Sequence, residues 1–103
     1  MNHRFHPEAL NEWHEAAAYY MDIREDLGDE FVNAIREAAG IILDSPQRWP
    51  PFTEHTQAYR LHRFPYRLVY SIEQPETVLI TSVMHTSRDS GFIEQRLRGT
   101  SGA

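Results

Sequence analysis

The chain of 103 residues contains no cysteine and no lysine. Without cysteine it can form neither a disulfide framework nor a thiolate metal site or nucleophile. No apolar run is long enough to span a membrane, and the first residues, MNHRFHPEALNEW, contain no apolar stretch typical of a signal peptide. These absences predict a cytoplasmic protein that makes no contact with a membrane.

Glycine is scarce as well, and the five glycines lie mostly at expected element ends or near residue 103. Loops that hold phosphates need glycines at fixed spacing, and neither a phosphate loop nor a dinucleotide fingerprint occurs. The segment HEAAA at 14–18 begins like a zinc-protease helix, but Ala18 stands where the second ligand would be. His3 and His6 have no evident third ligand. We therefore expect no cofactor and no metal.

Charge is distributed unevenly along the chain, whose formal net charge is −5. Residues 1–54 hold eleven acidic residues and four arginines, whereas residues 55–103 hold four acidic residues, six arginines and three histidines. The guanidinium group is planar and can bind a phosphate or carboxylate through two hydrogen bonds. The cations of the second half are therefore either solvated surface residues or a surface that meets a phosphate.

The apolar pattern predicts two helices that follow a short strand at residues 2–5. Pro7 suits the first turn of a helix over residues 7–26, and Gly28 and Asp29 are expected to end this helix and begin the next. The second helix should end before Asp44 and Pro46. The predicted inner positions are Leu10, Trp13, Ala17, Tyr20 and Ile23 in the first helix and Phe31, Ile35, Ala38 and Ile42 in the second.

Three strands are predicted in the second half, at residues 58–63, 66–73 and 77–84, because these segments are rich in Tyr, Val, Leu and Ile. The segment FIEQRLR at 92–98 is typical of a short helix. The order of elements predicts a single α+β domain over residues 1–103, with an N-terminal helical hairpin packed on one face of a small antiparallel sheet and a short C-terminal helix.

A two-residue loop at Phe64 and Pro65 would divide the strand residues between two faces of the sheet. The face against the helices would hold Tyr59, Leu61, Arg63, Tyr66, Leu68, Tyr70, Ile72, Val78, Ile80, Ser82 and Met84. The open face would hold Arg60, His62, Arg67, Val69, Ser71, Leu79, Thr81, Val83 and His85. In this arrangement His62, Arg67 and Val83 form a row across three strands with His85 beyond it, so the open face is expected to be cationic over an apolar floor.

Several segments, taken in order, resemble the RelE/ParE superfamily of bacterial type II toxin–antitoxin toxins. They are HPEAL, the YY pair, LGDEFVNAI, SPQRWP, RLHRFPYRLVYSI, VLITSVMHTSRDSGF and a terminal QR. The resemblance implies an α+β fold of two helices on an antiparallel sheet, no cofactor, and a cognate antitoxin as partner. It leaves open whether the chain forms a homodimer or a toxin–antitoxin hetero-oligomer.

The resemblance also implies roles for individual residues. Arg67 matches the arginine that contacts the scissile phosphate in RelE-like ribonucleases, and Arg60, His62 and His85 fall where that branch carries other basic groups. These four are the candidates for catalysis or for contact with the target. Arg88, Phe92 and Arg96 are candidates for binding target or antitoxin, with Asp89 and Glu94 as alternative partners of the two arginines.

Two departures favour the ParE-like, plasmid-stabilisation branch over a ribonuclease. Phe92 stands where RelE-like toxins can carry a catalytic tyrosine, and the chain has no lysine. The resemblance therefore implies a growth-inhibiting toxin that acts on DNA gyrase, with metal-independent cleavage of ribosome-bound mRNA as the alternative. A third interpretation is a non-toxic module that retains only antitoxin binding.

Overall fold

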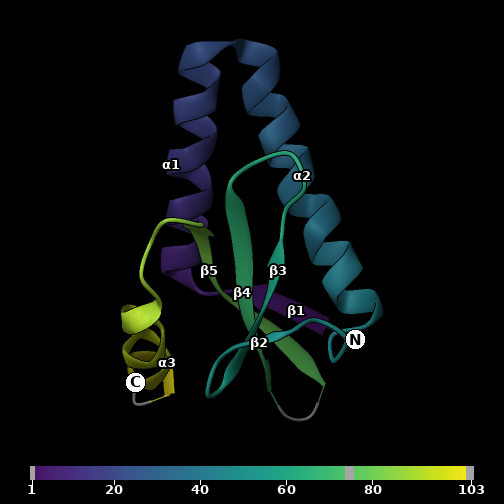
Figure 1. Ribbon diagram of the computed structural model, residues 1–103, viewed down its shortest axis with the longest axis vertical. Coiled ribbons are helices and arrows are strands. Elements are labelled where there is room, and N and C mark those ends of the chain that lie inside the picture. The colour runs from purple at the N-terminus through teal and green to yellow at the C-terminus, as the bar shows by residue number, and fades with distance from the viewer. Residues whose placement is uncertain (1, 74–75, 102–103) are drawn as a thin grey trace.

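The computed structural model describes residues 2–73 and 76–101, and Figure 1 shows their arrangement. Strand β1 (Asn2–Phe5) precedes a hairpin of two long helices, and four strands and a C-terminal helix follow. The helices are α1 (Pro7–Ile23), α2 (Glu25–Asp44) and α3 (Ile93–Ser101), with a 3₁₀ turn, η1 (Ser90–Phe92), before α3. The predicted α+β class is confirmed.

The sheet has five strands in the order β1-β5-β4-β3-β2, where β2 is Pro51–Thr53, β3 Thr56–Arg60, β4 Tyr66–Glu73 and β5 Thr77–His85. Strands β2 to β5 pair antiparallel, and β1 pairs parallel with β5 at the opposite edge. The sequence pattern indicated strand β1 but not its parallel pairing. It did not indicate β2 at all, because prolines flank this segment and only three residues pair.

The two helices meet at Arg24, and the predicted junction at Gly28 and Asp29 is wrong. Arg24 is extended (φ −164°, ψ 130°), and α2 begins with the next residue. Gly28 lies inside α2, buried against α1, where an added Cβ would stand 2.8 Å from Cβ of Met21. Glycine is thus required here by the close approach of two helices and not by a helix end.

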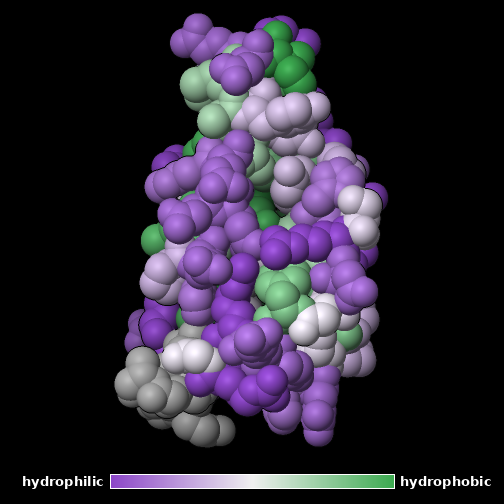
Figure 2. Space-filling model, turned by 90° about the vertical axis from the view of Figure 1, so that its left-hand side faces the viewer, coloured by the Kyte–Doolittle hydropathy of each residue, from purple (hydrophilic) through white to green (hydrophobic). Residues whose placement is uncertain are grey.

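The inner core lies between the helical hairpin and the sheet. All four predicted residues of α2 are buried in it, as are Ala9, Ala16 and Ala17 of α1. Leu10 and Ile23 were assigned to the inner stripe of α1, but 37% and 59% of their surfaces are exposed. Ile23 lies near the tip of the hairpin, which extends beyond the sheet in Figure 1 and carries hydrophobic surface at the top of Figure 2.

The loop between β3 and β4 is longer than the predicted two residues. Arg60 lies opposite Arg67, so residues 61–65 connect the two strands. Phe64 in this loop packs in the core, with its ring centre 5.1 Å from that of Phe31. His62 therefore does not lie opposite Arg67 as predicted. The pairing is displaced by two residues, which preserves the alternation, so Tyr59 and Leu68 still face the helices.

A β-bulge in β5 reverses the predicted faces of the residues after Thr81. Strand β4 pairs regularly up to Tyr70 with Ile80, and Val69 then pairs with Ser82, which leaves Thr81 as the extra residue. Val83 consequently joins the inner core and Met84 the opposite face. The predictions that Ser82 and Met84 face the helices and that Val83 and His85 lie on the open face are wrong.

The outer face of the sheet is partly covered by α3. Val69, Met84 and Ile93 form a second, smaller apolar cluster, against which Phe52, Ala58, Phe92 and Leu97 pack. Of the residues predicted to form the apolar floor of an open cationic face, Val69 thus lies in this second core, whereas Val83 lies in the inner one. What remains accessible on this face lies beside α3, over β2, β3 and β4.

Candidate functional site

A groove of about 340 Å³ on the outer face brings together three of the predicted site residues, Arg60, His62 and Arg67. Its other lining residues are mostly aromatic, proline or apolar: Trp49, Pro50, Pro51, Phe52, Ala58 and Tyr59. The groove therefore combines cationic side chains with flat apolar walls. Surfaces of this composition can hold a planar anion or an acidic peptide segment.

Arg60 and Arg67 lie directly opposite each other on neighbouring strands. Like charges in this position repel, and within the described residues no carboxylate forms an ion pair with either arginine. Arg67 stacks over the ring of Phe52 at 4.9 Å, and Arg60 donates hydrogen bonds to the carbonyl groups of Leu61 and Phe64. An anion between them would relieve the repulsion.

The two arginines differ in how far they are engaged by the protein. Arg60 Nη1 lies 2.7 Å from the Leu61 carbonyl oxygen, so much of its hydrogen-bonding capacity holds the β3–β4 loop in place. Among the described residues, the Arg67 guanidinium contacts the aromatic face of Phe52. The exposed imidazole of His62 borders the same groove and lies 6.3 Å from the ring of Tyr59. Arg67 is therefore the cation most available to a ligand.

His85 does not belong to this groove. It pairs with Tyr66 and packs on its ring at 5.3 Å, on the helix side of the sheet. Its Nδ1 accepts a hydrogen bond from the Ser87 backbone N–H at 3.1 Å, which closes the turn after β5. The bulge at Thr81 separates His85 from Arg67, so the predicted row across three strands does not form.

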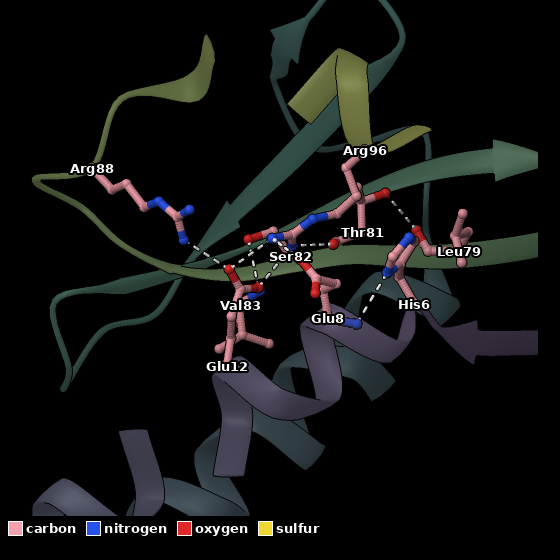
Figure 3. Close-up of polar contacts among 9 residues, drawn as sticks. All are labelled: His6, Glu8, Glu12, Leu79, Thr81, Ser82, Val83, Arg88 and Arg96. Carbon is pink, nitrogen blue, oxygen red and sulfur yellow. Dashed lines mark hydrogen bonds and ion pairs between the residues drawn. The ribbon is translucent and has the colours of Figure 1, made fainter. Parts of the chain in front are cut away.

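Arg88 and Arg96 lie at a second place, around the carboxylate of Glu12 from α1 (Figure 3), and Phe92 lies against both arginines. Arg88 donates to Glu12 Oε2 at 2.9 Å and Arg96 to Oε1 at 3.0 Å. Both guanidinium groups also lie over the ring of Phe92, at 3.8 and 4.7 Å. The partners suggested by the sequence, Asp89 and Glu94, form neither of these ion pairs.

The Glu12 carboxylate and Arg96 also satisfy the backbone of the bulge. Glu12 accepts hydrogen bonds from Ser82 Oγ and from the Val83 N–H, and Arg96 donates to the Thr81 carbonyl at 2.9 Å. The Arg96 side chain is only 9% exposed. Glu12 was missed in the sequence because its partners lie 70 to 84 positions away, at separations that no local pattern indicates.

Two other residues considered in the sequence, Arg63 and His6, have partners within the fold. Arg63 was assigned to the helix side of the hairpin, but it is exposed and pairs with Glu30 of α2 at 2.9 Å. The imidazole of His6 caps α1 by accepting the Glu8 backbone N–H at its Nδ1. Partial burial, with the nearby Arg96 charge, lowers the pKa of His6, which favours the neutral ring that this cap requires.

Comparison with protein families identifies one match. The sequence model of the family described as "ParE toxin of type II toxin-antitoxin system, parDE" matches residues 3–90. This span begins within β1, includes the helical hairpin and strands β2 to β5, and ends at the start of η1. The match therefore covers the groove of Arg60, His62 and Arg67 as well as Glu12 and Arg88.

Two solved structures share the fold. One is the chromosomal ParDE toxin–antitoxin system from P. aeruginosa, with a TM-score of 0.73, 12% identity, and coverage of 82% of this chain and 95% of that one. The other is the isolated E. coli RelE toxin, with a TM-score of 0.60, 22% identity, and coverage of 94% and 96%. Among curated proteins no sequence matches. At these identities the structural likeness concerns the fold alone.

Proposed function

The chain belongs to the family of ParE toxins of type II toxin–antitoxin systems, and we propose that it arrests growth by inhibiting DNA gyrase. It is the toxin of such a module, and its partner is an antitoxin. The observation that carries the proposal is the family match over residues 3–90. The proposed contact surface is the groove of Arg60, His62 and Arg67, where uncompensated positive charge meets aromatic walls.

The placement of the remaining candidates supports inhibition by binding. Cleavage of RNA needs groups that move the proton of the 2′-hydroxyl and protonate the leaving oxygen at one phosphate. His85 lies on the other side of the sheet from Arg67, and Arg88 and Arg96 are held by Glu12. Phe92 lies beneath these two arginines and carries no hydroxyl. A binding inhibitor needs none of these groups at the groove.

Cleavage of mRNA is a second candidate, favoured by one observation. The groove offers an imidazole, two arginines and three aromatic side chains, and single-stranded RNA is commonly recognised by stacked bases and paired phosphates. In this alternative His62 would be the proton acceptor and Arg67 would stabilise the phosphate. The fold shared with E. coli RelE is compatible with it but does not favour it over gyrase inhibition.

Growth and enzyme assays distinguish these functions. Induction of the chain alone is expected to stop growth, and co-expression of the antitoxin from the neighbouring reading frame should restore it. The purified toxin should inhibit supercoiling by gyrase and leave mRNA intact in a translating extract. Cleaved mRNA with unaffected supercoiling would replace gyrase by RNA as the target, and normal growth with retained antitoxin binding would indicate a non-toxic module.

The role of Arg67 can be tested with a matched control. Arg67→Ala should raise the toxin concentration needed for half-inhibition of gyrase by about tenfold or more, as expected when an arginine central to an interface is truncated. Arg36 is the control, since it is an exposed arginine of α2 and lies outside the groove. If Arg67→Ala and Arg36→Ala inhibit equally well, the groove is not the contact surface.

A further inference from the structure

A second pocket on the outer face is bordered by Glu54, His55 and Glu94. It has a volume of about 480 Å³ and lies between the β2–β3 turn, strand β4 and α3. One ligand atom from each of the three side chains lies within 4.8 Å of the others. Glu54 and His55 are neighbours in the turn, whereas Glu94 comes from the first turn of α3. The fold thus joins two segments that the sequence keeps apart.

The spacing of these groups is close to that of metal ligands. Nδ1 of His55 lies 3.1 and 3.2 Å from the two oxygens of Glu94. Two ligands that are each about 2.0 to 2.2 Å from a tetrahedral metal ion lie roughly 3.3 to 3.6 Å apart. His55 and Glu94 are at hydrogen-bond distance and need to move apart by only about a few tenths of an ångström to admit an ion between them. The exposed side chain of Glu54 can close the remaining distance by changing rotamer.

Ser71 provides a second and independent indication of a ligand. It lines the same pocket, is 9% exposed, and its Oγ is buried with no hydrogen-bond partner in the part of the chain that the structure describes. A buried hydroxyl without a partner costs about 1 to 3 kcal/mol, so it calls for an explanation such as a bound ion or water in the adjacent space. Water bound to a metal ion would supply the missing partner.

The charges around the pocket favour a cation. Glu54 and Glu94 contribute two carboxylates, and Glu73 at the border is already paired with Arg4 at 2.6 Å. Two positive groups oppose a cation in this pocket. One is Arg98 at its border, and the other is the N-terminus of α3, which is equivalent to only about half a positive charge. The exposed Arg98 side chain can turn toward solvent, whereas the Glu94 carboxylate is held at the pocket by Thr53 and His55.

We propose that Glu54, His55 and Glu94 bind a divalent transition-metal ion such as Zn²⁺, which joins the β2–β3 turn to α3. One imidazole with two carboxylates suits Zn²⁺, whereas Mg²⁺ prefers oxygen ligands and gives up its water reluctantly. Thr53 Oγ1 donates to Glu94 at 3.1 Å and orients that carboxylate as an outer partner. The metal would also steady Phe52, which lies in the same short strand and forms a wall of the arginine groove.

The test is metal-dependent stability of the full chain, prepared without a histidine tag. Zn²⁺ at a hundredfold excess over its dissociation constant is expected to raise the Tm by roughly 10 °C, and equilibrium dialysis should give one ion per chain. Mg²⁺ at the same concentration should raise the Tm far less. No rise with Zn²⁺ would overturn the proposal.

Variants decide whether the ion binds at this site. Glu54→Gln changes an exposed side chain and should weaken Zn²⁺ binding at least tenfold without unfolding the chain, and His55→Gln with Glu94→Gln should abolish it. The matched control is His14→Gln with Glu15→Gln, an exposed neighbouring pair on α1, which should bind Zn²⁺ as the unaltered chain does. Equal binding by Glu54→Gln and the control would show that the ion lies elsewhere and would overturn the assignment.

Discussion

The two faces of the sheet are covered in different ways. On one face the helical hairpin packs a continuous apolar core, in which Phe31, Ile35 and Ile42 are fully buried. On the other face the nine-residue helix α3 covers a small cluster of Val69, Met84 and Ile93. The Glu12 ion network holds α3 to α1 and β5 on this second face. The inner face thus depends on apolar burial, and the outer face depends in addition on a few specific polar contacts.

The inner face is expected to carry most of the stability, and the outer face most of the proposed binding sites. A broad apolar interface tolerates changes at its exposed rim, so the hairpin can support the sheet without precise polar geometry. The outer face carries the arginine groove and the Glu54, His55 and Glu94 cluster, which need particular side-chain positions. Residues of the outer face are therefore expected to influence activity more, and global stability less, than residues of the inner face.

Truncation of one isoleucine in each core tests this contrast most directly. Ile35 and Ile93 are both 0% exposed, so the same atoms are removed from the same degree of burial. Ile35→Ala should lower the free energy of unfolding by about 4 kcal/mol and Ile93→Ala by about 2, because α3 can detach without unfolding the rest. Urea denaturation measures both values, and hydrogen exchange in Ile93→Ala should show faster exchange confined to α3.

Equal losses of stability in these two variants would show that α3 unfolds only with the whole molecule. Ile41→Ala serves as the control on α2, because this side chain is 40% exposed and fills no part of the core. It should change the free energy of unfolding by less than about 1 kcal/mol.

The Glu12 network can be weakened by Glu12→Gln, which removes the charge and keeps one of the two acceptor oxygens. Glu12→Gln keeps an oxygen for Ser82 and Val83 but leaves the nearly buried Arg96 without its main counter-charge. We expect a loss of about 2 kcal/mol, below the range for a fully buried pair because Arg88 is half exposed and Glu8 remains near Arg96. Chemical denaturation gives the stability, and proteolysis near residue 90 reports release of α3.

The comparison for Glu12→Gln is Glu73→Gln, which breaks the exposed pair of Arg4 and Glu73. That change should cost less than about 1 kcal/mol. If both variants lose the same small amount of unfolding free energy, the ion pairs around Glu12 stabilise the fold no more than an exposed surface pair does.

The smallest expected effect is a pH dependence on the inner face. Burial raises the pKa of Tyr70 from 10.0 to about 12, and its hydroxyl donates to the Pro46 carbonyl. The unfolded chain therefore loses this proton before the folded chain does, so the stabilisation is complete below pH 10 and is lost as the pH rises toward 12. Tyr70→Phe should flatten part of this decline in urea denaturation between pH 9 and 12.

Burial also raises the pKa of Tyr20 and of Tyr66, so some alkaline sensitivity should remain in Tyr70→Phe. Tyr19 is 61% exposed, and Tyr19→Phe should leave the decline unchanged. A decline of the same steepness in Tyr70→Phe and in the unaltered chain would exclude Tyr70 as its source.

The inner face was largely predictable from the sequence, because its signals are local. The stripe of Phe31, Ile35, Ala38 and Ile42 follows the helical period, and strand β4 follows the apolar alternation from Tyr66 to Glu73. The predicted loop at Phe64 and Pro65 was too short, which displaced the predicted pairing by two residues. Side chains alternate with a period of two, so the assignment of strand residues to the two faces remained correct.

The outer face was predicted less well, because one extra residue in β5 changes which side chains point to that face. Thr81 bulges out of β5, and every later side chain of the strand reverses its side, which separates His85 from the groove. The contacts that satisfy the bulge come from Glu12 and Arg96, far away along the chain. Of the predicted site residues, Arg60, His62 and Arg67 share the groove as a set, because all three lie before the bulge.

The parallel pairing of β1 with β5 imposes an order on folding during synthesis. Asn2 is made long before its partner in the sheet, Thr77. The helical hairpin can form while the ribosome is still translating the strands, but β1 has no partner until β5 emerges. Strand β4, which carries Arg67, likewise lacks its neighbour β5 until then. A nascent chain therefore cannot complete its sheet before β5 has been translated.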